Sequence, residues 1–388
     1  WVQTSHLQTE RKFNRTIYGS VGKLLPVPQE VIDAGGEPSP IRNTANTNVI
    51  YHGEKLLAMW EGGFPHLLNP DLSTVGLYDY GGALKPGDAL TAHPKVCPTT
   101  GQLVSCTQRW DSPNYWVQIF DARGKHMQTI PVEFTRKGII HDLQITDNYV
   151  VIFYAPSFHS VEKAMKGENP FMWEPELGTR IIAIPRSGKG DNIVFETDAF
   201  FSWHYCNGFE RDGKLVIDYV WINSIPFTQD QGTGVEKQPR RMHRMTLDPA
   251  TRRVSDEEFS DVFCEFSRVD ERRMGKTYRY GFAASSNRDW GDAHGYNCTG
   301  RFDFETGETT LWEHGTDANA GEPVYVPNPD SDREEDGWVM CFVHNPEEGA
   351  SLTVLSAGDF TGGPVCKVHI PGRVPNGFHA NWMQHLTL

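Results

Sequence analysis

The chain has 388 residues and carries 50 acidic against 36 basic side chains, a formal net charge of −14. This charge argues against nucleic acid as a partner, because binding to phosphates requires a basic surface. No apolar run approaches the roughly 18 residues of a spanning helix. Large closed all-β folds routinely use this many residues in one unit, so we expect a single domain over residues 1–388.

Seven cysteines are scattered along the chain and never form a CxxC pair. An odd set of this kind is poorly suited to a disulfide framework and favours a reducing, cytoplasmic location. The chain begins with Trp1 and shows no basic-then-apolar signal segment. We therefore expect its beginning to be trimmed.

Short strands separated by turns are predicted for most of the chain, which contains 37 glycines, 25 prolines and 12% aromatic residues. Apolar residues with the period of two that is typical of strands recur at 56–60, 150–154, 215–220 and 338–343. No long stretch keeps a helical period. Only residues 160–166 are expected to form a short helix.

A turn rich in Asp, Pro and Gly recurs six times between these strands. Asp accepts hydrogen bonds from the backbone two residues on, and Gly supplies positive φ, so each copy predicts a hairpin tip. The copies lie at residues 69–71, 120–124, 185–188, 247–250, 302–307 and 357–362. Their spacing of 50 to 66 residues fits a four-stranded blade and favours an all-β propeller, although sandwiches and barrels use similar turns. Residues 1–13 are expected to be the end of an earlier, incomplete blade.

Four histidines lie in comparable settings at widely separated positions: His93, His141, His204 and His379. The intervals of 48, 63 and 175 residues between them differ from the i, i+4 spacing of a helical zinc site. Such intervals indicate one ligand from each structural unit, converging on an axis. A single histidine is more often structural, but the set predicts a four-histidine metal centre. Imidazole ligands suit zinc, copper, iron and nickel.

Three glutamates lie in apolar strand settings and could orient these histidines: Glu61, Glu265 and Glu322. A ligating histidine usually donates its second ring N–H to a carboxylate, which fixes the ring orientation. Three carboxylates would also supply the negative charge that four neutral ligands lack. We therefore predict that these glutamates surround the metal centre without binding the metal.

Six segments together resemble the carotenoid cleavage oxygenase family, from near the start of the chain to its end. They are NTNV at 46–49, LAMWEGG at 57–63, TAHP at 91–94, HDLQITDNY at 141–149, EFSR at 265–268 and GFHANW at 377–382. Their order is that of the family. The resemblance implies a seven-bladed β-propeller capped by helical and loop segments, with iron(II) on the axis held by four histidines.

Matched position by position, the resemblance makes His93, His141, His204 and His379 the iron ligands, with Glu61, Glu265 and Glu322 as their carboxylate partners. Thr47 matches a small residue that crowds a vacant coordination position in several relatives. Relatives also carry several dozen more residues at the N-terminus, so we expect the first blade to be incomplete here.

The implied reaction is cleavage of a carbon–carbon double bond by O₂ to give two carbonyl products. Stilbene-cleaving members place a lysine where this chain has Trp60, so we favour a carotenoid or apocarotenoid as substrate, with stilbene cleavage as the alternative. A retinoid isomerohydrolase, which needs no oxygen, is less favoured. A non-enzymatic binding platform would require degraded ligands, whereas all four histidines remain.

An oily substrate is expected to lie in an apolar tunnel. The candidate substrate-binding residues are Trp60, Trp203, Phe64 and Phe201, although packing between strands would also explain the two phenylalanines. The long segment 155–173 carries five large apolar residues, which are Phe158, Met165, Phe171, Met172 and Trp173. They predict either a tunnel mouth that contacts a membrane surface peripherally or a cap on the propeller core.

Overall fold

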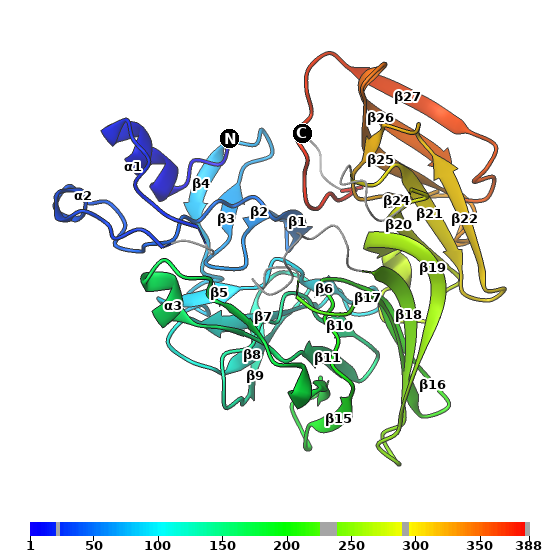
Figure 1. Cartoon of the computed structure of the whole chain (residues 1–388), viewed down its shortest axis with the longest axis horizontal. Coiled ribbons are helices and arrows are strands. Elements are labelled where there is room, and N and C mark those ends of the chain that lie inside the picture. The colour runs from blue at the N-terminus through cyan, green and yellow to red at the C-terminus, as the bar shows by residue number, and fades with distance from the viewer. Residues whose placement is uncertain (21–23, 226–238, 289–294, 385–388) are drawn as a thin grey trace.

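Antiparallel sheets follow one another around a common centre in the computed structural model, which describes residues 1–20, 24–225, 239–288 and 295–384 (Figure 1). The first sheet contains β1 (Asn48–His52), β2 (Lys55–Met59), β3 (His66–Leu68) and β4 (Thr74–Leu77). The second contains β5 (Asp88–Leu90), β6 (Lys95–Val96), β7 (Leu103–Arg109), β8 (Tyr115–Phe120) and β9 (His126–Val132). The third contains β10 (Gln144–Ile145), β11 (Tyr149–Tyr154), β14 (Thr179–Pro185) and β15 (Ile193–Thr197).

One continuous seven-stranded sheet forms the next two blades. Its strands are β16 (Tyr205–Arg211), β17 (Lys214–Ile222), β18 (Arg240–Leu247), β19 (Val254–Val269), β20 (Tyr280–Ser286), β21 (Cys298–Asp303) and β22 (Glu308–Glu313). The 16-residue β19 pairs with β18 through its first part and with β20 through its last part. It is therefore the outer strand of the fourth blade and the inner strand of the fifth.

The last blade closes the series near the C-terminus. It contains β23 (Asn319–Ala320), β24 (Val324–Pro327), β25 (Gly337–Asn345), β26 (Gly349–Ser356) and β27 (Pro364–Ile370). A separate hairpin of β12 (Ser157–His159) and β13 (Phe171–Trp173) lies outside the blades. The described residues thus form six blades, and the propeller predicted from the turn spacing is confirmed.

All six predicted turns join the two outermost strands of a blade, from β3–β4 through to β26–β27. Their aspartates act as expected. Asp121 Oδ1 accepts from Arg123 N at 2.9 Å, and Asp248 Oδ1 accepts from Ala250 N at 2.9 Å. Gly124 has a φ of +78°, which an L side chain rarely adopts. These local bonds stabilise the turns whose regular spacing in the sequence indicated the length of a blade.

The blades pack through strands that are apolar on both faces, as β11 illustrates. Val150 and Ile152 join a core cluster with Val104 of the second blade. Val151 and Phe153 point the other way and join a cluster with Ile217 of the fourth blade. Because successive side chains of a strand face opposite sides, a strand between two neighbouring blades is buried on both.

The helices are short and lie outside the blades. They are α1 (Ser5–Phe13), α2 (Gln29–Asp33) and α3 (Val161–Met165), with 3₁₀ turns η1 (Pro175–Leu177) and η4 (Glu271–Arg273). The α3 helix confirms the one predicted from the sequence. The prediction that residues 1–13 form the end of a blade is wrong, because Thr4 Oγ1 accepts from Leu7 N at 3.1 Å and caps α1 instead. None of the helices in the described ranges is long and apolar enough to cross a membrane.

The C-terminal segment returns to the first blade. Asn381 Nδ2 donates to Asn48 Oδ1 and to the carbonyl oxygen of Val49, each at 2.8 Å. The backbone N–H of His379 donates to the carbonyl of Thr47 at 3.3 Å. These bonds span more than 330 residues of sequence and hold the end of the chain against β1, beside the central axis.

A buried ion pair stabilises the junction of the fourth and fifth blades. Arg244 donates from Nε and Nη2 to the two carboxylate oxygens of Asp218 at 2.7 and 2.9 Å. Tyr278 Oη donates to the same carboxylate at 2.6 Å. The Asp218 side chain is fully buried, so its charge depends on these partners.

We expect Arg244→Met to lower the free energy of unfolding by about 3–5 kcal/mol, because it leaves an uncompensated buried carboxylate. Urea denaturation followed by tryptophan fluorescence measures this change. The matched control is Arg241→Met, which removes the more exposed pair with Glu258 and should cost about 1 kcal/mol or less. Equal losses in the two variants would contradict the assigned role of Asp218.

Candidate metal centre

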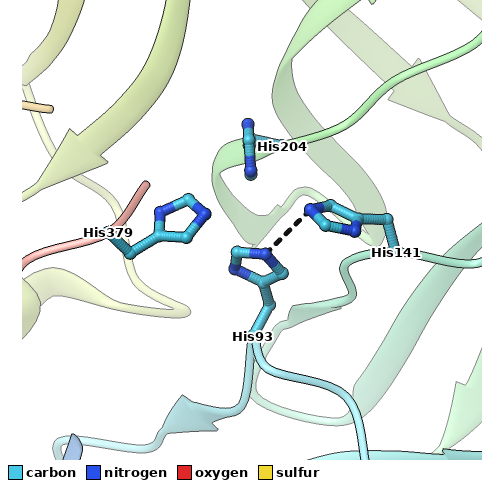
Figure 2. Close-up of side chains that lie close together, drawn as sticks. All are labelled: His93, His141, His204 and His379. Atoms are coloured by element: carbon cyan, nitrogen blue, oxygen red, sulfur yellow. Dashed lines mark hydrogen bonds between the residues drawn. The ribbon is translucent and has the colours of Figure 1, made fainter. Parts of the chain in front are cut away.

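The four predicted histidines meet at one point on the propeller axis. One ligand atom from each of His93, His141, His204 and His379 lies within 4.8 Å of the others (Figure 2). Three of the rings come from residues just ahead of an innermost strand, namely β6, β10 and β16. The fourth comes from the segment after β27. The fold thus delivers one ring from each of four separate units, as the spacing predicted.

Three of the rings are oriented by glutamates through their Nδ1 atoms. His141 Nδ1 bonds to Glu61 at 2.6 Å, and His204 Nδ1 bonds to Glu265 at 2.5 Å. His379 Nδ1 bonds to Glu322 at 2.9 Å. Because an ionised carboxylate only accepts, each Nδ1 carries the proton and each Nε2 presents a lone pair. The structure therefore places each of the three predicted glutamates against one of the predicted histidines.

A β-bulge in β19 places Glu265. The register with β20 shifts between Glu265 and Arg268, and Phe266 inside the shift has a φ of +56°. Glu265 also accepts a hydrogen bond from the backbone N–H of Phe266 at 2.5 Å. Bulges redirect side chains beside functional sites, and here the strand turns its carboxylate toward His204. Burial alone would raise the pKa of Glu265, but the His204 ring lowers it.

Arg268 holds the fourth histidine in place. Its Nη1 donates to Glu322 at 3.0 Å and to the carbonyl of Ala380 at 2.7 Å. Its Nη2 donates to Asn381 Oδ1 at 2.8 Å. Burial alone would raise the pKa of Glu322, but Arg268 and His379 lower it to about 2. The carboxylate is therefore ionised over the whole physiological range.

The inward nitrogen atoms fit a cation. His204 Nε2 is buried and has no hydrogen-bond partner in the structure. His93 Nε2 and His141 Nε2 lie 2.9 Å apart, so both nitrogen atoms face the same point. Burial and the neighbouring rings hold the pKa of His93 well below its usual value, which favours the neutral ring that a cation requires. Four neutral imidazoles are a donor set that suits iron, zinc, copper or nickel.

Thr47 lies beside this centre, where its backbone carbonyl accepts from the His379 N–H at 3.3 Å. Trp60 directly precedes Glu61 and covers the turn that follows. A Cβ added to Gly62 would lie 2.3 Å from the Trp60 ring, so only glycine fits beneath the indole. Phe64 packs against the core cluster of Leu57 and its neighbours. Phe64 thus has the packing role that the sequence offered as its alternative.

An aromatic cluster adjoins the centre on the His141 side. The Trp203 ring lies 4.8 Å from the His141 ring, edge to face, and 4.6 Å from the Phe201 ring. The cluster also contains Phe171 and Trp173 of the β12–β13 hairpin. Two of the predicted substrate-binding residues, Trp203 and Phe201, are thus in contact beside the metal centre.

The hairpin region divides the predicted apolar patch. Phe158 is 4% exposed and belongs to the main core cluster, which fits the second of the two roles predicted for this segment, a cap on the propeller core. Met172 packs against the same core cluster. The exposed apolar side chains are Val161 and Met165, at 43% and 58%, on α3.

A cavity of about 350 Å³ lies on the axis and reaches His93, His204 and His379. Each blade lines it with residues at or beside its innermost strand, and the lining includes Lys95, Asp142, Arg268 and Asp270. It shares no residue with the aromatic cluster. Sequence reasoning did not assign roles to Lys95, Asp142 or Arg268, although each lies inside or beside a quoted motif.

Comparisons with known proteins agree with this geometry. The family model described as retinal pigment epithelial membrane protein matches residues 1–384. The apocarotenoid-15,15'-oxygenase of Synechocystis is 31% identical over 99% of this chain and 81% of its own. The isoeugenol monooxygenase of Pseudomonas nitroreducens is 30% identical over 99% of this chain and 83% of its own length. The resveratrol cleavage oxygenase 1 of Aspergillus fumigatus is also 30% identical, over 99% of this chain and 80% of its own length.

The similarity extends to three dimensions. The crystal structure of cobalt-substituted Synechocystis apocarotenoid oxygenase superposes with a TM-score of 0.89 at 29% identity, over 99% of this chain and 83% of that chain. Sequence, fold and the four-histidine centre thus lead to the same conclusion. The chain belongs to the retinal pigment epithelial membrane protein family, the carotenoid cleavage oxygenases.

Proposed function

We propose that the chain is a non-haem iron(II) dioxygenase that cleaves a carbon–carbon double bond of a carotenoid or apocarotenoid. The observation that carries the proposal is the set of four imidazoles that face one point, three of them held by glutamates, beside an aromatic cluster. The alkene and one O₂ account for all atoms of two carbonyl products. The reaction therefore needs no organic cosubstrate.

Within this proposal His93, His141, His204 and His379 hold the iron through Nε2. Bound iron(II) supplies the activation of O₂. The negative charges of Glu61, Glu265 and Glu322 offset the charge of the cation through the rings and keep each Nδ1 protonated. Thr47 is proposed to limit access to a vacant coordination position.

The apolar side chains near the centre are proposed to bind the substrate and exclude water from it. Trp203 and Phe201 are best placed, because their rings contact each other and the Trp203 ring contacts His141. Trp60 and Phe64 are proposed to line the path farther from the centre. No side chain has to transfer a proton, since each product carbonyl takes one oxygen atom.

The choice of substrate class rests on Trp60. An indole carries no charge and cannot form an ion pair with a phenolate oxygen, which a lysine at this position could. Carotenoid-derived polyenes lack that group and need only apolar contact. Stilbene cleavage is the second candidate, because a relative named for resveratrol cleavage matches over nearly the whole chain.

The proposed cellular location and membrane contact of the enzyme follow from the same substrate class. We propose one functional domain over residues 1–388 and a cytoplasmic protein that contacts membranes peripherally through residues 155–173. We centre this membrane contact on the exposed side chains of Val161 and Met165, which flank Lys163 on α3. An exposed apolar pair beside a cation suits an anionic lipid surface.

Removing the glutamate charges should weaken the iron site. We expect Glu265→Gln and Glu322→Gln each to lower iron affinity by about 10- to 100-fold, because the amide preserves shape but not the charge that orients the ring. Glu61→Gln should have a smaller effect, since Glu61 is 35% exposed. Competition with a metal chelator measures the affinity. The control is Glu196→Gln on the exposed face of β15, and equal affinities in all four variants would remove the role assigned to the glutamates.

The substrate class is tested with a panel of apocarotenals, stilbenes and isoeugenol, given to iron-loaded protein under O₂. We expect two aldehyde or ketone products from the polyenes, identified by mass, with consumption of one O₂ per bond cleaved. Turnover of the phenolic substrates alone would replace the carotenoid assignment by stilbene-type cleavage. Turnover of a retinyl ester without O₂ would contradict the dioxygenase proposal.

A further inference from the structure

The four histidines are not held in the same way. His141, His204 and His379 each bond to a glutamate, whereas among the described residues no carboxylate lies within ion-pair distance of His93. His93 nevertheless occupies the middle of the set. Its ring centroid lies 4.4 Å from that of His141, 5.0 Å from that of His204 and 4.3 Å from that of His379. Contacts of another kind must therefore fix the position of His93.

One buried carboxylate connects the segments that carry three of the ligands. Asp142 accepts from Lys95 Nζ at 2.8 Å and from the backbone N–H of Tyr205 at 3.0 Å. Lys95 is two residues after His93, Asp142 directly follows His141, and Tyr205 directly follows His204. A single side chain thus ties together the backbones behind His93, His141 and His204.

The burial of this pair shows how closely it is held. The Lys95 side chain is 12% exposed and the Asp142 side chain 2%. A buried carboxylate is costly unless hydrogen bonds satisfy its oxygens. Asp142 has three such bonds, the third from the N–H of Leu143 at 2.7 Å. A displacement of any one segment would break one of them.

A neutral bridge reinforces the same connection from the other side of His93. Thr91 Oγ1 donates to the carbonyl of His141 at 2.8 Å and accepts from the N–H of His93 at 3.3 Å. The segments of His93 and His141 are therefore joined both before and after the His93 ring. This double connection fixes their distance without any contact to the ring itself.

We propose that Lys95 and Asp142 are positioning residues of the metal centre, which set the relative positions of His93, His141 and His204 through their backbones. For His93 this pair replaces the glutamate that orients each of the other rings. The inference rests on the metal binding proposed above, but it concerns the geometry of the centre rather than the reaction. An ion pair that only stabilised the fold would leave that geometry unchanged when it is replaced.

The chain contains a matched control for this distinction. Arg244 and Asp218 form a similarly buried ion pair on β18 and β17, with side chains 23% and 0% exposed, and neither is adjacent in sequence to a ligand histidine. Replacing both partners of a buried pair avoids the isolated charge that a single replacement leaves. We therefore compare Lys95→Met/Asp142→Asn with Arg244→Met/Asp218→Asn.

The measurement is a titration of metal-free protein with Co²⁺, read by its visible absorption, whose position and intensity report coordination geometry. We expect Lys95→Met/Asp142→Asn to bind Co²⁺ about 10- to 100-fold more weakly, with a changed spectrum, as for other groups that support metal ligands. The Arg244→Met/Asp218→Asn control should keep the wild-type affinity and spectrum. A Lys95→Met/Asp142→Asn variant with wild-type affinity and spectrum overturns the inference. Wild-type protein that binds no Co²⁺ contradicts the metal centre itself.

A milder pair of variants covers the case in which the double variant does not fold. Lys95→Arg retains the positive charge, whereas Lys95→Gln removes it at similar length. We expect Lys95→Arg to remain close to the wild-type spectrum and Lys95→Gln to lose affinity by about 10-fold. Identical Co²⁺ spectra and affinities in these two variants would also overturn the inference.

Discussion

Hydrogen bonds from imidazole Nδ1 atoms to glutamates determine how the rest of the site can be built. Each bond fixes the tautomer of its ring and turns the Nε2 lone pair toward the axis, where three such lone pairs meet beside the His93 ring. The carboxylates have to stay ionised at or near the core for this to work. Arg268 provides that condition for Glu322, whose pKa it lowers to about 2 together with His379. The metal centre therefore depends on charges that do not bind the metal.

The propeller supplies these groups with little adjustment to its regular pattern. Three ligands lie just ahead of an innermost strand, where each blade begins at the axis. Departures from the regular strand pairing are local, and they position side chains of the metal centre. The bulge between Glu265 and Arg268 directs one side chain to His204 and the other to Glu322. The axial cavity and the aromatic cluster share no lining residue, so they occupy different parts of the surroundings.

Much of this arrangement could be predicted from the sequence because it rests on short-range chemistry or on motifs. The Asp and Gly turns predict the blade period, and the four histidines and three glutamates lie in segments that can be recognised in the sequence. Other features depend on long-range contacts that no local pattern reveals. Phe158 reads as one member of an apolar run, but its burial depends on a neighbouring blade. The α1 helix is mostly polar, and its Thr4 cap and buried His6 define it better than any periodicity. Lys95 and Asp142 were hidden for the same reason, since their pairing spans 47 residues.

The central claim is that one metal ion is held by all four histidines, and anomalous diffraction at the iron edge tests it most directly. Crystals of iron-loaded protein should show a single peak on the propeller axis, about 2.1 Å from the Nε2 atoms of His93, His141, His204 and His379, as is typical of metal–imidazole bonds. The peak should be lost or strongly reduced in crystals of His204→Ala. A peak that lies instead against glutamate oxygens, or that keeps full height in His204→Ala, would contradict the account.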